Sequence, residues 1–189
     1  MDERESSESA APDEQGARTG KAQLHLVVGP VAAGKSTFAL RLAREQGAVL
    51  MNLDEWMAQL FHDEARPESG IMAWYVERTA RCIEQIWRMT ERLVAVGTSV
   101  VLEIGLIQRA DRERLYERVE ASGFALTIYV LDGSRELRRE RVKQRNREQG
   151  ETFSMVVPAH IFELASDLWE PLDATECSGR DVRFIESDR

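Results

Sequence analysis

The chain has 189 residues, of which 43% are hydrophobic, and this size allows one domain with a well-buried core. A net charge of −8 argues against a broad nucleic-acid-binding surface, which needs a basic footprint. No apolar run approaches the roughly 20 residues of a membrane span and the N-terminus has no apolar signal core, so we expect a cytoplasmic protein. The two cysteines and three histidines are scattered, which argues against a disulfide framework and a zinc site.

The chain begins with an acidic segment that carries no hydrophobic periodicity. Residues 1–21 are rich in Ser, Glu, Gly and Ala, and we expect them to form a disordered tail. Residues 22–189 are expected to form a single domain. The domain begins with an apolar run at residues 24–28, which is typical of a buried strand.

A phosphate-binding pattern follows this first strand. Residues 29–37 read GPVAAGKST and match G-x-x-x-x-G-K-[ST], and the amphipathic pattern after them predicts a helix. Gly29 and Gly34 permit backbone conformations that let successive N–H groups surround an anion. Lys35 is expected to reach the β- and γ-phosphates of a nucleotide, and the Ser36 hydroxyl is expected to bind Mg²⁺. The residues expected to bind the nucleotide are Gly29, Pro30, Val31, Ala32, Ala33, Gly34, Lys35, Ser36 and Thr37.

The second predicted strand, at residues 48–51, is followed by a candidate catalytic acid. We expect Asp54 to accept the proton of an acceptor hydroxyl during phosphoryl transfer. Alternatively, Asp54 caps the helix that follows it, and Glu55 is the adjacent candidate for the catalytic role. Trp56 is a candidate to line the acceptor pocket, although an aromatic residue at helical spacing more often belongs to a core.

A second candidate acid lies at the end of the third predicted strand. Residues 55–96 are expected to be mostly helical with a break at residues 66–70, and residues 99–104 predict a buried strand. Glu103 near the end of this strand would hold Mg²⁺ through water, or it would instead bind Lys35 or a backbone amide. Ligands of parallel sheets bind beyond the carboxyl ends of the strands, where these candidate residues lie.

An arginine-rich helix is predicted at residues 134–148, after a helix at about 109–121 and a strand at 125–131. Arg141 and Arg145 lie one turn apart, and we expect them to neutralise charge on the transferring phosphoryl group as part of a mobile lid. The alternative is a charged helix whose arginines are solvated.

The chain is expected to end with a helix from Pro158 to about Trp169 and an edge strand at residues 182–185. The alternation of strands and helices predicts an α/β fold with a parallel sheet that is covered on both faces.

Residues 23–186 resemble the small P-loop kinases, with an AAA-type ATP-binding domain, that include chloramphenicol phosphotransferase, the zeta toxins and the kinase half of polynucleotide kinase. The resemblance rests on the segments GPVAAGKST, NLDEW, VVLEIGLIQRADRERL, RVKQRN and VPAHIFELASDLWEPL. It implies a three-layer P-loop NTPase fold with a five-stranded parallel sheet of order 2-3-1-4-5 and a lid over ATP. It also implies Asp54 as the base and Arg141 or Arg145 as lid arginines. Glu103 departs from the family, in which Asp is common at this position.

Together, these patterns predict an ATP- and Mg²⁺-dependent kinase that phosphorylates a hydroxyl of a small molecule, such as an antibiotic or another metabolite. The alternatives are a zeta-toxin-like kinase of nucleotide-sugars and a polynucleotide 5′-hydroxyl kinase, although the acidic composition weighs against nucleic acid. A non-enzymatic alternative is a nucleotide-dependent switch that binds a partner protein. A carboxylate after the second strand and an arginine-rich lid favour the kinase, because a switch needs neither.

Overall fold

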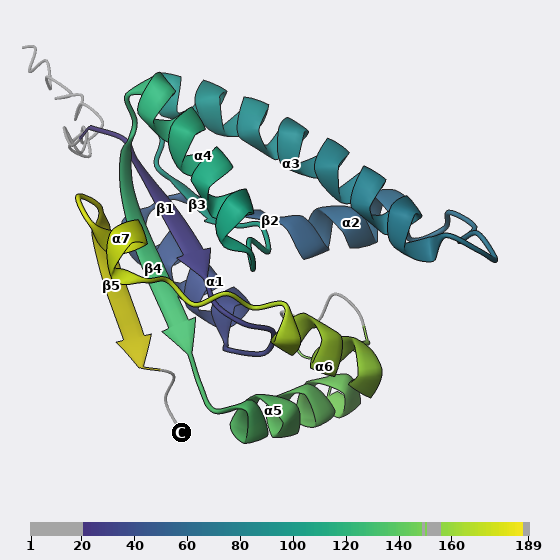
Figure 1. Ribbon diagram of the computed structural model, residues 1–189. Helices are drawn as coiled ribbons and strands as arrows, with labels where there is room; N and C mark the ends of the chain where they lie inside the picture. The colour runs from purple at the N-terminus through teal and green to yellow at the C-terminus, as the bar shows by residue number, and fades with distance from the viewer. Residues whose placement is uncertain (1–20, 149, 151–155, 187–189) are drawn as a thin grey trace, which may run out of the picture.

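The computed structural model describes residues 21–148, 150 and 156–186, so nearly all of the expected acidic tail lies outside the described residues. Its centre is a five-stranded parallel sheet of order β2-β3-β1-β4-β5 (Figure 1). This is the strand order that the resemblance implies, and the predicted α/β fold is confirmed. The strands are β1 (Gln23–Val28), β2 (Val49–Asn52), β3 (Val100–Glu103), β4 (Ala125–Asp132) and β5 (Asp181–Glu186).

The central strands are apolar on both faces because helices cover both sides of the sheet. All four residues of β3 are buried, as are the last five of β1. The edge strand β5 is more exposed, and Phe184 retains 66% of its surface. The phosphate-binding segment therefore follows β1, a strand that pairs with β3 on one side and β4 on the other.

The helices are divided between the two faces of the sheet (Figure 1). On one face, Ala39 and Leu42 pack against the side chains of Val27 and Val101. The other face carries the larger core, which includes Trp87 and receives the second, third and fourth helices. The helices are α1 (Lys35–Gln46), α2 (Leu53–Phe61), α3 (Ile71–Ala95), α4 (Arg109–Ser122), α5 (Arg135–Glu148), α6 (Ala159–Asp167) and α7 (Ala174–Cys177).

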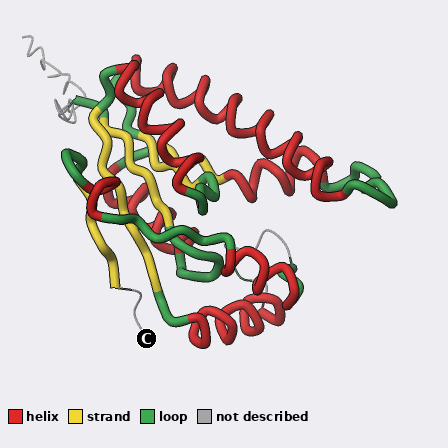
Figure 2. Tube along the Cα trace, viewed as in Figure 1, coloured by secondary structure: helices red, strands yellow, loops and turns green. Residues whose placement is uncertain are grey.

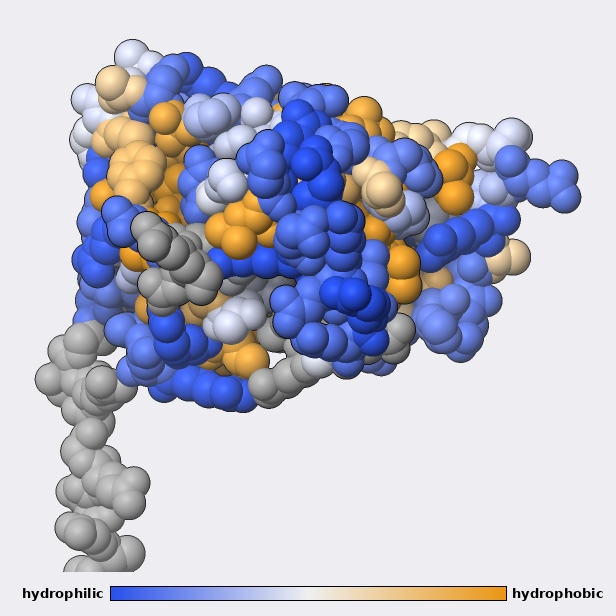
Figure 3. Space-filling view, turned by 90° about the horizontal axis from the view of Figure 1, so that it is seen from below, coloured by the Kyte–Doolittle hydropathy of each residue, from blue (hydrophilic) through white to orange (hydrophobic). Residues whose placement is uncertain are grey.

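Two helical units extend from the sheet (Figure 2). The antiparallel pair α2 and α3 projects to one side, and α5 and α6 pack together beyond the carboxyl end of β4. Ion pairs from Arg135 and Arg139 to Glu163 join α5 to α6. The face that is seen from below is predominantly hydrophilic, with smaller hydrophobic patches (Figure 3).

The predicted elements agree closely with the observed ones. The boundary between β2 and α2 differs, because the helix begins at Leu53 and so includes Asp54 in its first turn. The four-residue helix α7 was not predicted. Among the described residues, none of the helices has both the length and the apolar character that crossing a membrane requires.

Candidate functional site

The phosphate-binding loop between β1 and α1 has a backbone that three unusual residues make possible. Gly29 has φ 151°, and a Cβ at this position would overlap the carbonyl oxygen of Leu131. Gly34 has φ 91° and directly precedes α1, without a side chain that could obstruct the helix N-terminus. Between them, Ala32 adopts φ 62°, which is left-handed and uncommon for a residue with a Cβ. The loop therefore has three positive φ angles within six residues, a backbone of the kind from which anion-binding nests of amides are built.

Lys35 folds back over this loop. Its Nζ donates a hydrogen bond to the carbonyl oxygen of Pro30 over 2.9 Å. Burial lowers the pKa of Lys35, while the charges of Glu103 and Asp54 raise it. Among the described residues, the hydrogen bond observed for this ammonium is the one to Pro30, which holds it at the loop.

Ser36 and Glu103 meet at the adjacent carboxyl ends of β1 and β3. The Ser36 hydroxyl donates to Glu103 Oε1 over 2.9 Å, and Asn52 Nδ2 donates to Glu103 Oε2 over 2.5 Å. Burial raises the pKa of Glu103 to about 7, against the opposing effect of Lys35. Lys35 and Glu103 interact electrostatically, while the hydrogen bond observed for Lys35 goes to Pro30.

Asp54 lies in the first turn of α2 and is exposed. The cap of α2 is Asn52, whose Oδ1 accepts the N–H of Glu55 over 2.9 Å, so Asp54 does not have the capping role. The negative charge of Asp54 raises the pKa values of Lys35 and Glu103, which places its carboxylate within electrostatic reach of both.

Trp56 and Tyr75 lie on the helices α2 and α3, next to Asp54. Trp56 is partly buried and packs against the larger core, as expected for an aromatic residue at helical spacing. Burial raises the pKa of the Tyr75 hydroxyl, and the charge of Asp54 raises it further. Asp54 therefore acts electrostatically on an aromatic hydroxyl of α3.

The two candidate lid arginines approach the phosphate-binding loop from α5. Arg141 is close to the loop, because a Cβ at Gly34 would lie 3.9 Å from its Nη1. Arg145 acts electrostatically on Lys35 and Glu103 and lowers the pKa of each. Its Nε is buried and has no hydrogen-bond partner in the described part of the chain. An unpaired donor beside the nest fits an anionic ligand.

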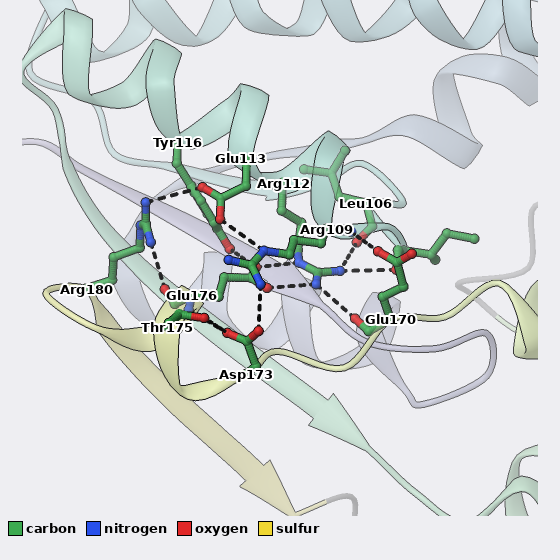
Figure 4. A network of polar contacts seen from close by, with 11 residues as sticks. Leu106, Arg109, Arg112, Glu113, Tyr116, Glu170, Asp173, Thr175, Glu176 and Arg180 are labelled. Atoms are coloured by element: carbon green, nitrogen blue, oxygen red, sulfur yellow. Dashed lines mark hydrogen bonds and ion pairs between the residues drawn. The ribbon is translucent and has the colours of Figure 1, made fainter.

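A buried ion pair supports the loop that follows Glu103 (Figure 4). Arg112 of α4 donates to both carboxylate oxygens of Glu176 over 2.6 and 2.9 Å, and both side chains are fully buried. Its remaining hydrogen bonds go to the carbonyl oxygens of Leu106, Ile107 and Glu170. The contact connects the end of β3 to the segment that returns from α6.

The same network contains a second layer of contacts around the ion pair (Figure 4). The Tyr116 hydroxyl donates to Glu176 Oε1 over 2.9 Å, and Glu176 raises the pKa of this hydroxyl in addition to the effect of burial. Arg109 pairs with Asp173 over 2.6 Å, and its N–H donates to the Glu170 carboxylate. The return segment is therefore attached to α4 at several points.

Sequence reasoning missed three residues that organise this site. Asn52 was passed over although it stands two residues before Asp54, and the side-chain amide satisfies both Glu103 and the helix N-terminus. Arg112 could not be distinguished from other helical arginines. Arg138 was passed over although its i, i+3 and i+7 spacing places it on the same helical face as Arg141 and Arg145.

The comparison with protein families decides to which group this loop and sheet belong. A model of the AAA domain matches residues 24–171, which include the phosphate-binding loop, Glu103 and both lid arginines. The chain belongs to the AAA domain family. A curated relative of this AAA domain protein is the tRNA dimethylallyltransferase of Chlorobium luteolum, which is 28% identical over 194 residues. The match includes 87% of the chain but spans only 58% of the relative's length.

Solved structures show the same fold at low sequence identity. A candidate kinase from Chloroflexus aurantiacus superposes with a TM-score of 0.69 at 18% identity, over 89% of this AAA domain protein and 86% of the other chain. Chaetomium thermophilum Kti12, solved with ADP-AlF3, gives 0.63 at 15% identity, over 87% and 89% of the two chains. The Mycobacterium tuberculosis APS kinase CysC gives 0.57 at 14% identity, over 89% and 90%. The fold is therefore that of the P-loop kinases.

The donor set at Ser36 and Glu103 fits a metal ion that is held together with a nucleotide. No cluster of three or more His, Cys, Asp or Glu side chains suited to a metal ion occurs among residues 21–148, 150 and 156–186. One hydroxyl and one carboxylate match the needs of Mg²⁺, which keeps several waters and takes further oxygens from substrate phosphates. Ser36 and Glu103 therefore fit an ion that is shared with a bound phosphate ligand.

Proposed function

We propose that this AAA domain protein is an ATP- and Mg²⁺-dependent kinase that transfers the γ-phosphoryl group to a hydroxyl of a small molecule, such as an antibiotic or another metabolite. The observation that carries the proposal is the position of Asp54, an exposed carboxylate within electrostatic reach of Lys35 and Glu103. A nucleotide switch needs the phosphate-binding loop but has no need of an acid beside it.

Binding of the nucleotide is assigned to the loop and to Lys35. The nest of amides and the N-terminus of α1 would hold the phosphates, and Lys35 would exchange its contact with Pro30 for phosphate oxygens. Ser36 would bind Mg²⁺ directly and Glu103 would hold it through water, where the ion neutralises charge on the phosphates.

Transfer is assigned to Asp54 and the lid. The acceptor oxygen would attack the γ-phosphorus while its proton passes to the Asp54 carboxylate, and ADP would leave. Arg141 and Arg145 of α5 would stabilise the charge on the transferring phosphoryl group. The buried and unpaired Nε of Arg145 supports this assignment.

The names of the curated relatives suggest a second candidate activity, which the experiment below distinguishes from the kinase activity. The curated relatives are tRNA dimethylallyltransferases, so their names describe the transfer of a dimethylallyl group to tRNA. The net charge of −8 weighs against a tRNA surface in this chain. A zeta-toxin-like kinase of nucleotide-sugars differs from our proposal only in the acceptor.

The experiment measures ADP release from ATP with a panel of hydroxyl compounds that includes amino-alcohol antibiotics, sugars, nucleotide-sugars and 5′-hydroxyl oligonucleotides. We expect one class to stimulate release, and mass spectrometry to find a product that is heavier by one phosphoryl group. Asp54→Asn should lower the turnover number by about 10²–10⁴-fold and leave ATP binding intact.

Two outcomes would contradict the kinase proposal. ATP binding without stimulation by any compound, together with nucleotide-dependent capture of a protein, would support a switch. Transfer from dimethylallyl diphosphate to tRNA without ATP would support the activity that the relatives' names describe. Glu55→Gln tests the other candidate acid, because Glu55 is the neighbouring exposed carboxylate of the same helical turn, and a loss of turnover in this variant rather than in Asp54→Asn would assign the role to Glu55.

A further inference from the structure

Arg138 is a buried arginine at the junction between the lid and the phosphate-binding loop. It lies on α5, and only 6% of its surface is exposed. Its Nη1 donates to the carbonyl oxygen of Val31, in the middle of the loop, over 3.1 Å. A charged side chain is rarely this buried unless its donors are used, so the contact has a specific role.

The position of the guanidinium is fixed by three further contacts. Its Nε donates to the carbonyl oxygen of Gly133, where the chain passes from β4 to α5, over 3.1 Å. Nη1 also donates to Ser166 Oγ of α6 over 3.1 Å, and the guanidinium lies 5.6 Å from the centre of the Phe162 ring. The contacts with Gly133, Ser166 and Phe162 therefore hold the Arg138 side chain in place where it meets the loop.

The contact acts on the peptide unit that precedes the strained residue of the loop. Val31 contributes the carbonyl and Ala32 contributes the N–H of one planar peptide, so these two groups point in opposite directions. Because Arg138 holds the Val31 carbonyl, the N–H of Ala32 points away from Arg138. Ala32 has φ 62°, and it is the only non-glycine residue with a positive φ in the described part of the chain. A residue with a Cβ keeps this conformation only when its surroundings enforce it.

We propose that Arg138 is a positioning residue that holds the Val31–Ala32 peptide in the conformation that binds phosphate. This inference rests on the nucleotide-binding part of the proposed function. Arg138 donates to the carbonyl oxygen of Val31, whereas Arg141 lies next to Gly34, and both Arg138 and Arg145 act electrostatically on Lys35. Because its hydrogen bonds go to protein groups, Arg138 would set the resting shape of the nest without touching the nucleotide.

The test compares the dissociation constants of ADP for three variants by calorimetry. Arg138→Gln should weaken ADP binding by tenfold or more. Arg139→Gln is the matched control, because Arg139 also lies over Phe162, and the hydrogen bond that the described residues show for it goes to Glu163 rather than to the loop. It should change the affinity by less than twofold. Adding Ala32→Gly to Arg138→Gln should recover most of the lost affinity, because glycine adopts the left-handed conformation without strain.

The controls separate this role from a general effect on folding and from the proposed function. Ala32→Gly alone is the reference against which the double variant is compared, and its melting temperature identifies any change in overall stability. Should Arg138→Gln fail to fold, Arg138→Lys keeps the charge and one donor, and its weaker binding should likewise be recovered by Ala32→Gly. Equal effects of Arg138→Gln and Arg139→Gln, or no recovery by Ala32→Gly, would overturn the inference. Absence of ADP and ATP binding by the parent protein would instead overturn the proposed function.

Discussion

The hydroxyl of Ser36 donates a hydrogen bond to the carboxylate of Glu103 over 2.9 Å, which joins two residues that are 67 positions apart in the chain. Ser36 lies in the first turn of α1 and Glu103 ends β3, and the strands β1 and β3 are direct neighbours. A metal ion held by one of these side chains is therefore within reach of the other.

Replacement of Glu103 by Gln is expected to raise the Mg²⁺ requirement. Glutamine keeps the shape and can still accept from Ser36, but it lacks the charge that would hold the water of the metal ion. We expect the Mg²⁺ concentration for half-maximal ATP turnover to rise by about tenfold, the lower end for an outer-shell metal partner. A titration of Mg²⁺ at saturating ATP measures this effect. An unchanged Mg²⁺ dependence would refute the metal role of Glu103.

Replacement of Arg145 by Gln is expected to lower turnover more than it lowers ATP affinity. The side chain acts on Lys35 and Glu103, so its charge lies at the site where the phosphoryl group would transfer. Loss of such a charge costs about 10²–10³-fold in the turnover number. Arg147→Gln is the matched control, because Arg147 is exposed on the same helix and loses the same charge. Equal losses in the two variants would show that only the overall charge of α5 matters.

Removal of Glu176 is expected to destabilise the fold strongly. Glu176→Ala leaves Arg112 buried without its partner, and loss of one member of a buried pair costs about 3–5 kcal/mol. Urea unfolding, followed by circular dichroism, measures the free energy of unfolding. Arg114→Ala breaks the exposed pair with Asp111 and should have little effect. A Glu176→Ala variant as stable as Arg114→Ala would contradict the structural role of the pair.

The buried His25 is expected to make the fold sensitive to acid. Burial lowers the pKa of His25 and the charge of Arg183 lowers it further, against the opposing effect of Asp181. The unfolded chain therefore takes up a proton near pH 6.5 while the folded protein does not, so the free energy of unfolding falls as the pH drops below about 6.5. The fall ends below the lowered pKa of the folded state.

Urea unfolding between pH 8 and pH 5 measures this slope for the parent and for His25→Leu. The variant should lose part of the pH dependence, whatever its absolute stability. His160→Gln is the matched control, because His160 is exposed and its replacement should leave the slope unchanged. A His25→Leu variant with the parent's slope would show that other groups cause the sensitivity to acid.

The alternation of strands and helices was sufficient to predict a parallel sheet, whereas its strand order came from the resemblance to the small P-loop kinases. Ser36 and Glu103 were expected at the same edge of this sheet, because ligands of parallel sheets bind beyond the carboxyl ends of the strands, and the structure shows that the two side chains are hydrogen-bonded. The residue that caps α2 depends on where the helix begins, and sequence patterns place a helix boundary only to within one or two residues. The helix begins at Leu53, so the cap is Asn52 and not Asp54.

Arg138 and the Arg112–Glu176 pair could not be predicted for a different reason. Arg138 binds a backbone carbonyl, and every residue has one, so no pattern of side chains identifies the acceptor. Arg112 and Glu176 are 64 positions apart, and most charged residues of a helix face solvent, so their burial depends on packing alone. The helix α7 is only four residues long, which is too short to show a periodicity.

The strand order has a consequence for how such a protein can diversify. The helix that carries Asp54 follows β2 and the arginine helix follows β4, and these strands are separated in the sheet by β3 and β1. The helix proposed to lie beside the acceptor and the helix proposed to lie over the phosphates therefore follow strands that are not neighbours in the sheet. Mutations can accumulate in α2 without displacing α5, so a change of acceptor would leave the groups proposed to bind the phosphate donor in place.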